Sequence, residues 1–242
     1  MQVKPYLIQI TVKRDKDIPF NEHPFNIPAI SKLDVLSFHQ DVTFIIGENG
    51  TGKSTIMEAI ALALGFGPEG GTKNVQLQTA DTVSRLHEYI RPIRSFSKPT
   101  DNYFLRAESF YNVATYMDEV GYLEGYGGQS LHQISHGEAF MATLTNKLRG
   151  HGLYILDEPE AALSPTRQMA ALAAIHRLVE DESQFIIATH SPILLSYPKS
   201  KIISLDNNEI KEIKYEDTEH YIITRSFLNN PSKMLKTLLN NE

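Results

Sequence analysis

The sequence predicts an α/β protein with a mostly parallel sheet, and three observations predict it. Short, almost wholly apolar runs occupy residues 42–46, 153–156 and 185–188, as is typical of strands buried on both faces of a parallel sheet. A glycine-rich loop and a helix-prone stretch follow the first run directly. Apolar residues recur at helical spacing after Ser164-Pro165, between the second and third runs. Such alternation is that of a parallel sheet wrapped by helices.

The remaining elements are placed by the same patterns. The β-branched run at residues 5–13 predicts an opening strand, and Asn230-Pro231 predicts the start of a short C-terminal helix. We expect one domain over residues 1–242, in which roughly residues 65–134 form an irregular and helical insert lobe. Within this plan, strands are expected at 103–106 and 201–205, helices at 108–118 and 135–149, loops with a short helix at 65–102, and a turn-rich connector at 121–130.

Composition excludes several classes of protein. With 242 residues, 41% of them hydrophobic, the chain can bury a large core and is neither disordered nor fibrous. It contains no Cys, which excludes disulfides, thiolate metal sites and a cysteine nucleophile and fits a cytoplasmic location. No secretory signal or membrane-spanning run is present, so we expect a soluble protein without membrane insertion.

The charge balance argues against a protein that coats nucleic acid. There are 23 Lys and Arg against 29 Asp and Glu, a net charge of -6, so any DNA contact would have to be local. One cluster could make it, although such a run is more often a solvated face: Arg85, Arg91, Arg94 and Lys98.

A phosphate-binding loop is predicted directly after the first apolar run. The segment from Gly47 to Ser54 matches G-x-x-x-x-G-K-[ST] at every fixed position. In such a loop backbone N–H groups converge on phosphate oxygens, Lys53 reaches the outer phosphates and the Ser54 hydroxyl can bind Mg²⁺. A chance glycine turn is the alternative, but four fixed positions arise by accident in roughly one chain in a hundred of this length. The residues expected to hold nucleotide here are Gly47, Glu48, Asn49, Gly50, Thr51, Gly52, Lys53, Ser54 and Thr55.

An acidic pair ends the second apolar run. Asp157 and Glu158 follow residues 153–156, at the strand end where open α/β sheets place their ligands. We expect Asp157 to hold Mg²⁺ and Glu158 to polarise an attacking water. The alternative, a solvated strand end, does not explain two carboxylates after an otherwise apolar strand.

A histidine follows the third apolar run. His190 comes after Phe185–Thr189 and precedes Ser191-Pro192. A lone His is usually a satisfied surface or core residue. If the strands ending near Ile46, Leu156 and Ala188 are neighbours, however, His190 lies at the same sheet edge as the phosphate loop, where a ring N–H could reach a γ-phosphate.

A capping box is predicted at residues 135–138, Ser-His-Gly-Glu. The Ser135 side chain would accept the Glu138 N–H, and the Glu138 side chain would reach back to Ser135. This structural role leaves room for a second one, because a helix start bearing Gly137 presents bare N–H groups to an anion.

Together these motifs resemble the ABC ATPase superfamily. GENGTGKS resembles its Walker A loop, LYILDE its Walker B strand, SHGE its signature, EAALSP its D-loop and ATHSP its switch-histidine loop, in the same order. DEPEAALSP and ATHSPIL look most like stand-alone bacterial predicted AAA/ABC ATPases, akin to the heads of RecF and structural-maintenance-of-chromosomes proteins. The resemblance implies a P-loop fold with a mostly parallel core sheet, an antiparallel β edge subdomain and a small helical lobe.

The resemblance also implies a partner and a ligand arrangement. Members of the superfamily bind two ATP molecules between two heads, so Ser135 and Gly137 would face the γ-phosphate held by the partner. His136 departs from the usual first Gly of the signature. The Gln of the Q-loop has no certain counterpart, and Glu108 is the nearest candidate to ligate Mg²⁺ through water. Phe25 is the one aromatic suggested to stack on adenine.

Three functions remain open from the sequence. The first is an ATPase that forms a homodimer on binding ATP, with Lys53, Glu158 and His190 as its catalytic residues, acting as a switch in DNA repair, genome maintenance or phage defence. The second is the ATP-binding subunit of an ABC transporter. The third is a nucleotide-dependent scaffold that recruits an effector protein.

Overall fold

A six-stranded sheet forms the centre of the computed structural model, which describes residues 4–13, 15–75, 77, 83–122 and 124–239. All neighbouring strands in it are parallel except the last pair, which is antiparallel. In order across the sheet the strands are β5 (Asp101–Arg106), β6 (Gly152–Asp157), β7 (Gln184–Ala188), β3 (Val42–Ile46), β8 (Lys201–Ser204) and β9 (Lys211–Ile213).

The strands that carry the predicted site motifs are neighbours. β7 lies between β6 and β3, with Asp157 and Ile45 both paired to Ala188 in the parallel registers. Their carboxyl ends therefore meet at one edge of the sheet. This is the condition on which His190 was expected to lie beside the phosphate loop.

A second, antiparallel sheet of three strands packs on one face of the central sheet. Its order is β2 (Val35–Ser37), β1 (Leu7–Val12) and β4 (Ile90–Arg94). The expectation of loops with one short helix over residues 65–102 is wrong at β4. That strand contains Pro92, which cannot donate a ladder hydrogen bond and is tolerated because β4 lies at an edge of its sheet.

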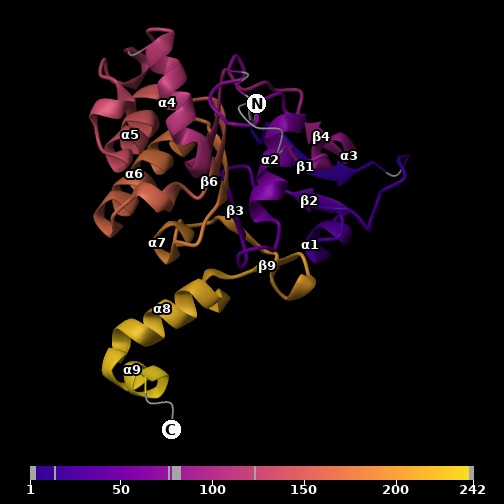
Figure 1. Ribbon diagram of the computed structural model, residues 1–242, viewed down its shortest axis with the longest axis vertical. Coiled ribbons are helices and arrows are strands. Elements are labelled where there is room, and N and C mark those ends of the chain that lie inside the picture. The colour runs from indigo at the N-terminus through magenta and orange to yellow at the C-terminus, as the bar shows by residue number, and fades with distance from the viewer. Residues whose placement is uncertain (1–3, 14, 76, 78–82, 123, 240–242) are drawn as a thin grey trace.

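Helices cover the central sheet on both faces (Figure 1). Phe44 and Ile46 of β3 belong to one core cluster and Ile45 to the other, as expected for a strand buried on both sides. The Ile45 side packs under the antiparallel sheet and α1 (Pro28–Ser31), α2 (Lys53–Ala63) and α3 (Leu86–Tyr89). The Phe44 side packs under α4 (Phe110–Glu119), α5 (His136–Ala142), α6 (Pro165–Glu180) and α7 (Pro192–Leu195).

This layering confirms the predicted fold class, with its mostly parallel sheet, antiparallel edge and helices. Residues 65–134, expected as an irregular and helical insert, also contain β4 and β5, so the segment contributes a strand to each sheet. No helix in the described part of the chain is long and apolar enough to cross a membrane.

The C-terminal segment extends from the rest of the molecule (Figure 1). It comprises α8 (Glu219–Asn229), which the sequence patterns did not predict, and α9 (Pro231–Leu239), which begins at the predicted Asn230-Pro231. Exposed apolar side chains line these two helices: Ile222, Ile223, Leu228, Leu235, Leu238 and Leu239.

Candidate functional site

The phosphate loop lies between β3 and α2, as predicted. Gly50 (φ 85°) and Gly52 (φ 96°) have left-handed backbone conformations that favour glycine. A Cβ at Gly52 would also lie 3.1 Å from Ile30. The loop therefore depends on glycine for both its turn and its packing.

Lys53 spans the phosphate loop. Its side chain is buried, and Nζ donates hydrogen bonds to the carbonyl oxygens of Gly47 (2.7 Å) and Glu48 (3.1 Å). Burial lowers the pKa of Lys53, against the opposing effect of Glu158 and Asp157. The ammonium group is thus held at the loop where phosphate oxygens would lie.

The other residues predicted to bind nucleotide sit on the same loop and the first turn of α2. Thr51 Oγ1 donates to the Glu48 carbonyl oxygen (2.8 Å), which closes the turn. Asn49 is exposed at the mouth of the loop, and Thr55 is half-buried on α2. Ser54, in the first turn of α2, points toward the end of β6.

Ser54 and Asp157 form an oxygen-lined pair. Ser54 Oγ donates to Asp157 Oδ1 at 3.3 Å, and the Asp157 side chain lies almost wholly out of solvent. Burial raises the pKa of Asp157 to about 7. A hydroxyl and a carboxylate are oxygen ligands that Mg²⁺ accepts, so these residues fit the predicted magnesium site.

Glu158 adopts the left-handed conformation (φ 53°) immediately after β6. Its N–H donates to the Ala188 carbonyl oxygen (2.9 Å), which fixes the turn against β7. The carboxylate is part-exposed, and its Oε1 lies 3.7 Å from His190 Nε2. The two side chains predicted to act on water and γ-phosphate therefore face each other.

His190 is held by its backbone and by a second histidine. Its N–H donates to Glu160 Oε1 (2.5 Å), and its Nδ1 lies 3.1 Å from His220 Nε2. Among the described residues, no hydrogen-bond partner is found for the buried His190 Nε2. Burial, and then Lys53, lower the pKa of His190, which favours the neutral ring. That orphaned ring nitrogen is suited to a phosphate oxygen.

The predicted capping box is confirmed at α5. The Glu138 N–H donates to Ser135 Oγ (3.4 Å), and Glu138 Oε2 accepts the Ser135 N–H (2.9 Å). Arg167, at the start of α6, contacts the same pair through Ser135 Oγ (3.3 Å) and Glu138 Oε1 (3.1 Å). Within the described residues, no hydrogen bond or ion pair of this group reaches the phosphate loop of its own chain.

Gly137 is required by close packing. A Cβ there would lie 2.5 Å from the Ala162 carbonyl oxygen and 2.6 Å from a guanidinium nitrogen of Arg167. The start of α5 therefore packs closely against the predicted D-loop, the segment that follows Glu158.

Glu108 and Phe25, two residues that the sequence suggested for ligand binding, contact other side chains of the protein. Glu108 has a largely exposed side chain that pairs with Arg106 at 3.2 Å, while Arg106 also binds Glu58 at 2.6 Å; its role as a magnesium ligand stays a prediction. The suggestion that Phe25 stacks on adenine is wrong, because Phe25 is buried and packs edge-on against Tyr89, with ring centroids 4.7 Å apart.

The sequence reasoning missed three supporting residues. Asp206, after β8, accepts the Glu48 N–H through Oδ1 (2.8 Å) and so holds the phosphate loop from the side. Glu160 holds the His190 backbone, and His220 contacts its ring. An acidic residue after an apolar strand was the available signal for Asp206; no local pattern marked His220.

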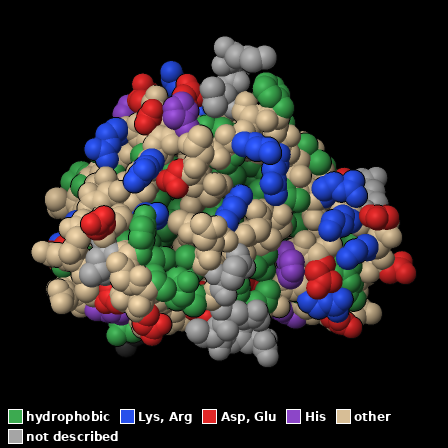
Figure 2. Space-filling view, turned by 90° about the horizontal axis from the view of Figure 1, so that it is seen from above, with side chains coloured by type: hydrophobic (Ala, Val, Ile, Leu, Met, Phe, Trp, Pro, Cys, Tyr) green, Lys and Arg blue, Asp and Glu red, His purple; other side chains and the backbone are tan. Residues whose placement is uncertain are grey.

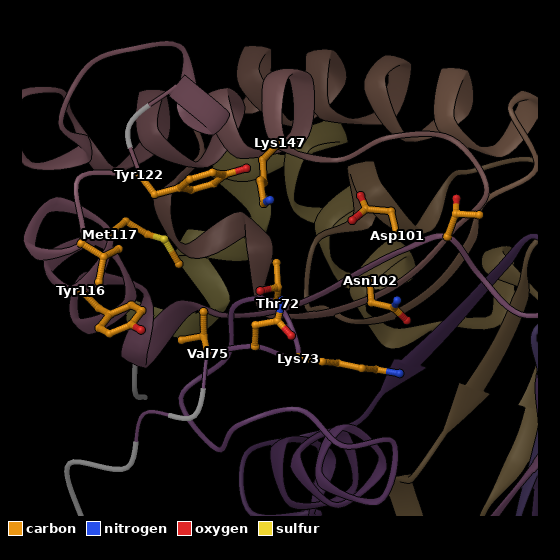
Figure 3. Close-up of a pocket in the computed structure, with 12 residues that line it drawn as sticks. Thr72, Lys73, Val75, Asp101, Asn102, Tyr116, Met117, Tyr122 and Lys147 are labelled. Atoms are coloured by element: carbon orange, nitrogen blue, oxygen red, sulfur yellow. The ribbon is translucent and has the colours of Figure 1, made fainter.

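A cleft of about 740 Å³ lies elsewhere, among the residues drawn in Figure 3. It includes Asp101 at the amino end of β5, whereas the phosphate loop follows the carboxyl end of β3. Lys147 lies over the Tyr122 ring at 5.1 Å on one side of it. Because ligands of open α/β sheets bind at the carboxyl ends of the strands, the loop edge is the candidate site.

A buried strand, a glycine-rich loop and a helix in this order are typical of P-loop nucleotide-binding proteins, and comparisons with known proteins agree. A family model described as an AAA domain matches residues 23–114. A putative ABC transporter ATP-binding protein of Staphylococcus aureus (strain MSSA476) is 26% identical over 197 residues, 72% of this chain and 34% of the relative. The chain thus spans about a third of that relative's length.

Two further comparisons cover more of the matched protein. A putative ABC transporter ATP-binding protein of Pyrococcus furiosus is 24% identical over 200 residues, 76% of each chain. The solved ADP conformation of an ATP-binding cassette of an ABC transporter matches with a TM-score of 0.50 and 20% identity, over 98% of this chain and 100% of that one. The relatives are described as putative ATP-binding proteins of ABC transporters, and the solved cassette shares the fold of this chain.

Proposed function

We propose that this chain binds and hydrolyses ATP with Mg²⁺, and that two copies close on the nucleotide as an ATP-gated homodimer. The observation that carries the proposal is the meeting of Lys53, Asp157, Glu158 and His190 at the ends of three neighbouring strands. Glycine turns, a buried lysine and an oxygen pair supply the donors and ligands that phosphoryl transfer requires.

The residues divide the chemistry between them. The backbone of residues 47–55 and Lys53 would bind the phosphates, and Ser54 with Asp157 would hold Mg²⁺. A bound Mg²⁺ would neutralise charge on the β- and γ-phosphates. Glu158 would accept a proton from the attacking water, and the His190 Nε2–H would donate to the γ-phosphate.

The homodimer supplies a ligand for the start of α5. Ser135 is hydrogen-bonded to Glu138 and Arg167, and Gly137 packs against Ala162 and Arg167, so both residues contact their own chain away from its phosphate loop. In the proposed dimer this surface faces the γ-phosphate bound by the other copy, and Arg167 beside it adds a positive charge that an anion favours.

A Glu158→Gln variant tests this proposal. It should bind Mg²⁺-ATP, lose turnover by about 100-fold or more, and sediment as a stable dimer at saturating ATP while remaining a monomer without nucleotide. Glu180→Gln, on the exposed end of α6, removes the same charge outside the site and should behave as wild type. A Glu158→Gln protein that stays monomeric with saturating ATP and Mg²⁺ would contradict the dimer.

For the process served, we propose a switch in DNA repair, genome maintenance or phage defence. Figure 2 shows Lys and Arg side chains spread among acidic ones on the face it presents, so the fold gives DNA no single broad basic surface there. An ATPase assay with and without duplex DNA, at several salt concentrations, tests a local contact. Stimulation lost on replacing Arg91 and Arg94, both exposed on β4, would support DNA as the partner.

A transporter subunit is the second candidate, because the names of the relatives in Staphylococcus aureus and Pyrococcus furiosus describe ATP-binding proteins of ABC transporters. Co-purification of the chain with a polytopic membrane protein would favour that function over the switch. A scaffold that recruits an effector would instead bind ATP without measurable turnover.

A further inference from the structure

A histidine of the C-terminal segment contacts the histidine of the proposed catalytic site. His220, the second residue of α8, places Nε2 3.1 Å from His190 Nδ1. The ring centroids are 5.3 Å apart and the planes are inclined by 48°, which brings the two nitrogens into hydrogen-bonding distance. The contact joins α8 to the loop after β7.

The start of α8 is anchored beside this loop. Thr218 is fully buried, caps α8 by accepting the Tyr221 N–H (3.2 Å), and donates to the Tyr215 carbonyl oxygen (2.8 Å). The Tyr215 hydroxyl donates to the Pro192 carbonyl oxygen (2.9 Å), only two residues beyond His190. These bonds fix the position of His220 relative to His190.

The pair lies at the mouth of the phosphate loop. A cleft of about 420 Å³ adjoins both histidines, and acidic and amide side chains from the loop and from the end of β8 line it as well. Its lining includes Glu48, Asn49, His190, Asp206, Glu219 and His220. The contact is therefore part of the nucleotide-binding edge and not a remote packing contact.

A hydrogen bond between two neutral rings fixes which nitrogens carry protons. Burial lowers the pKa of His220, with His190 contributing next, and burial also lowers the pKa of His190. One N–H lies between the facing nitrogens. If His220 Nε2 donates it, His190 Nδ1 is the acceptor and His190 Nε2 carries the ring proton that faces Glu158 and the phosphate.

We propose that His220 is a positioning residue that fixes the ring orientation and the tautomer of His190 for ATP turnover. The inference rests on the proposed ATPase function. It assigns to α8, an element outside the recognised motifs, a direct influence on the catalytic edge.

Steady-state kinetics of the full chain test the role. His220→Ala should lower kcat for ATP by about 10- to 100-fold, the usual effect of losing a residue that orients a catalytic group, with KM within about twofold because phosphate binding does not use this contact. His220→Gln, whose amide can reach the place of the imidazole Nε2, should restore most of kcat. An unchanged kcat in His220→Ala, or a Gln variant as slow as the Ala variant, would overturn the proposal.

A double variant separates positioning from general destabilisation. If His220 acts through His190, then His190→Ala and His190→Ala/His220→Ala should have the same kcat. Arg225→Ala removes a contact of the same helix, the Arg225–Tyr221 hydrogen bond of 2.9 Å, and should leave kcat unchanged. Losses that multiply in the double variant, or an equal loss in Arg225→Ala, would show that α8 acts only through stability.

Imidazole NMR of protein labelled with ¹⁵N-histidine reports the contact without any turnover. The His190 ring nitrogens, assigned from the His190→Ala spectrum, should show a single neutral tautomer in the wild type and a mixed one in His220→Ala. A preserved tautomer in His220→Ala would overturn the proposal even in an active enzyme. If the wild type shows a single tautomer that is lost in His220→Ala but hydrolyses no ATP, the proposed function is refuted while the contact between the two histidines remains supported.

Discussion

Asp157→Asn tests whether the buried carboxylate at the end of β6, proposed to bind Mg²⁺, lowers the free energy of unfolding of the nucleotide-free protein. Asp157 is 4% exposed, and only the Ser54 hydroxyl (3.3 Å) is hydrogen-bonded to it among the described side chains. Burial is the main cause of its raised pKa, and Arg106 opposes it without cancelling it. Asn has nearly the same shape and carries no charge, so it removes the cost of ionising the buried group.

The magnitude follows from two pKa values for the same carboxyl. The pKa of Asp157 is about 7 in the folded protein, against an ordinary value of 3.8 that applies to the unfolded chain. The folded chain therefore holds a proton that the unfolded chain has already lost, and stability is lost as pH rises from 3.8 towards 7. A difference of about 3 pKa units corresponds to at most about 4 kcal/mol at pH 8 and less than about 1 kcal/mol at pH 4.

Urea unfolding of the nucleotide-free protein measures this difference. Asp157→Asn should unfold at higher urea than wild type at pH 8, and the two should nearly coincide at pH 4. Saturating Mg²⁺-ATP should narrow this difference, because a ligand at 100 times its Kd adds about 2.7 kcal/mol to the protein that binds it and the variant lacks a metal ligand. Equal stability at pH 8 without nucleotide would refute the reasoning.

Two further predictions concern packing. Gly137→Ala should abolish the ATP-dependent dimer in sedimentation experiments, because the new Cβ would lie 2.5 Å from the Ala162 carbonyl oxygen and displace the start of α5. The affinity of the monomer for ATP should stay within about twofold. A dimer that forms as in wild type would contradict the close packing. Ile155 is fully buried on β6. In urea unfolding, Ile155→Ala should lower the free energy of unfolding by about 2–5 kcal/mol and Ile155→Val by about 0.5–1.5 kcal/mol. Equal losses in the two variants would show that the site tolerates a cavity.

Local sequence was sufficient where one segment determines the geometry. The phosphate loop needs only a strand, its glycines and a helix start, all within residues 42–63. The capping box needs only residues 135–138, and the structure forms both of its hydrogen bonds. The mostly parallel sheet followed from apolar runs separated by helical stretches, whereas the order of β6, β7 and β3 in it was only a condition that the structure meets.

Sequence was insufficient where tertiary contacts decide. β4 was missed because residues 65–102 are rich in Gly, Pro, Ser and Thr with little periodicity, yet its edge position accommodates Pro92. Phe25 was only suggested for adenine, and its burial against Tyr89 could not be read from neighbouring residues. His220 lies 30 residues after His190, and their contact depends on how Tyr215 and Thr218 anchor α8.

The segment after Glu158 links three parts of the site that the sequence presents as separate motifs. Glu160 accepts the His190 N–H, and the Ala162 carbonyl oxygen lies where a side chain on Gly137 would have to go. These residues belong to one 3-10 helix, Pro159–Ala162. In the proposed ATPase, a displacement of Glu158 on loss of the γ-phosphate would move the histidine or the start of α5, because close-packed contacts shift between discrete arrangements. In the proposed dimer this short helix is the physical connection between hydrolysis in one copy and release of the other.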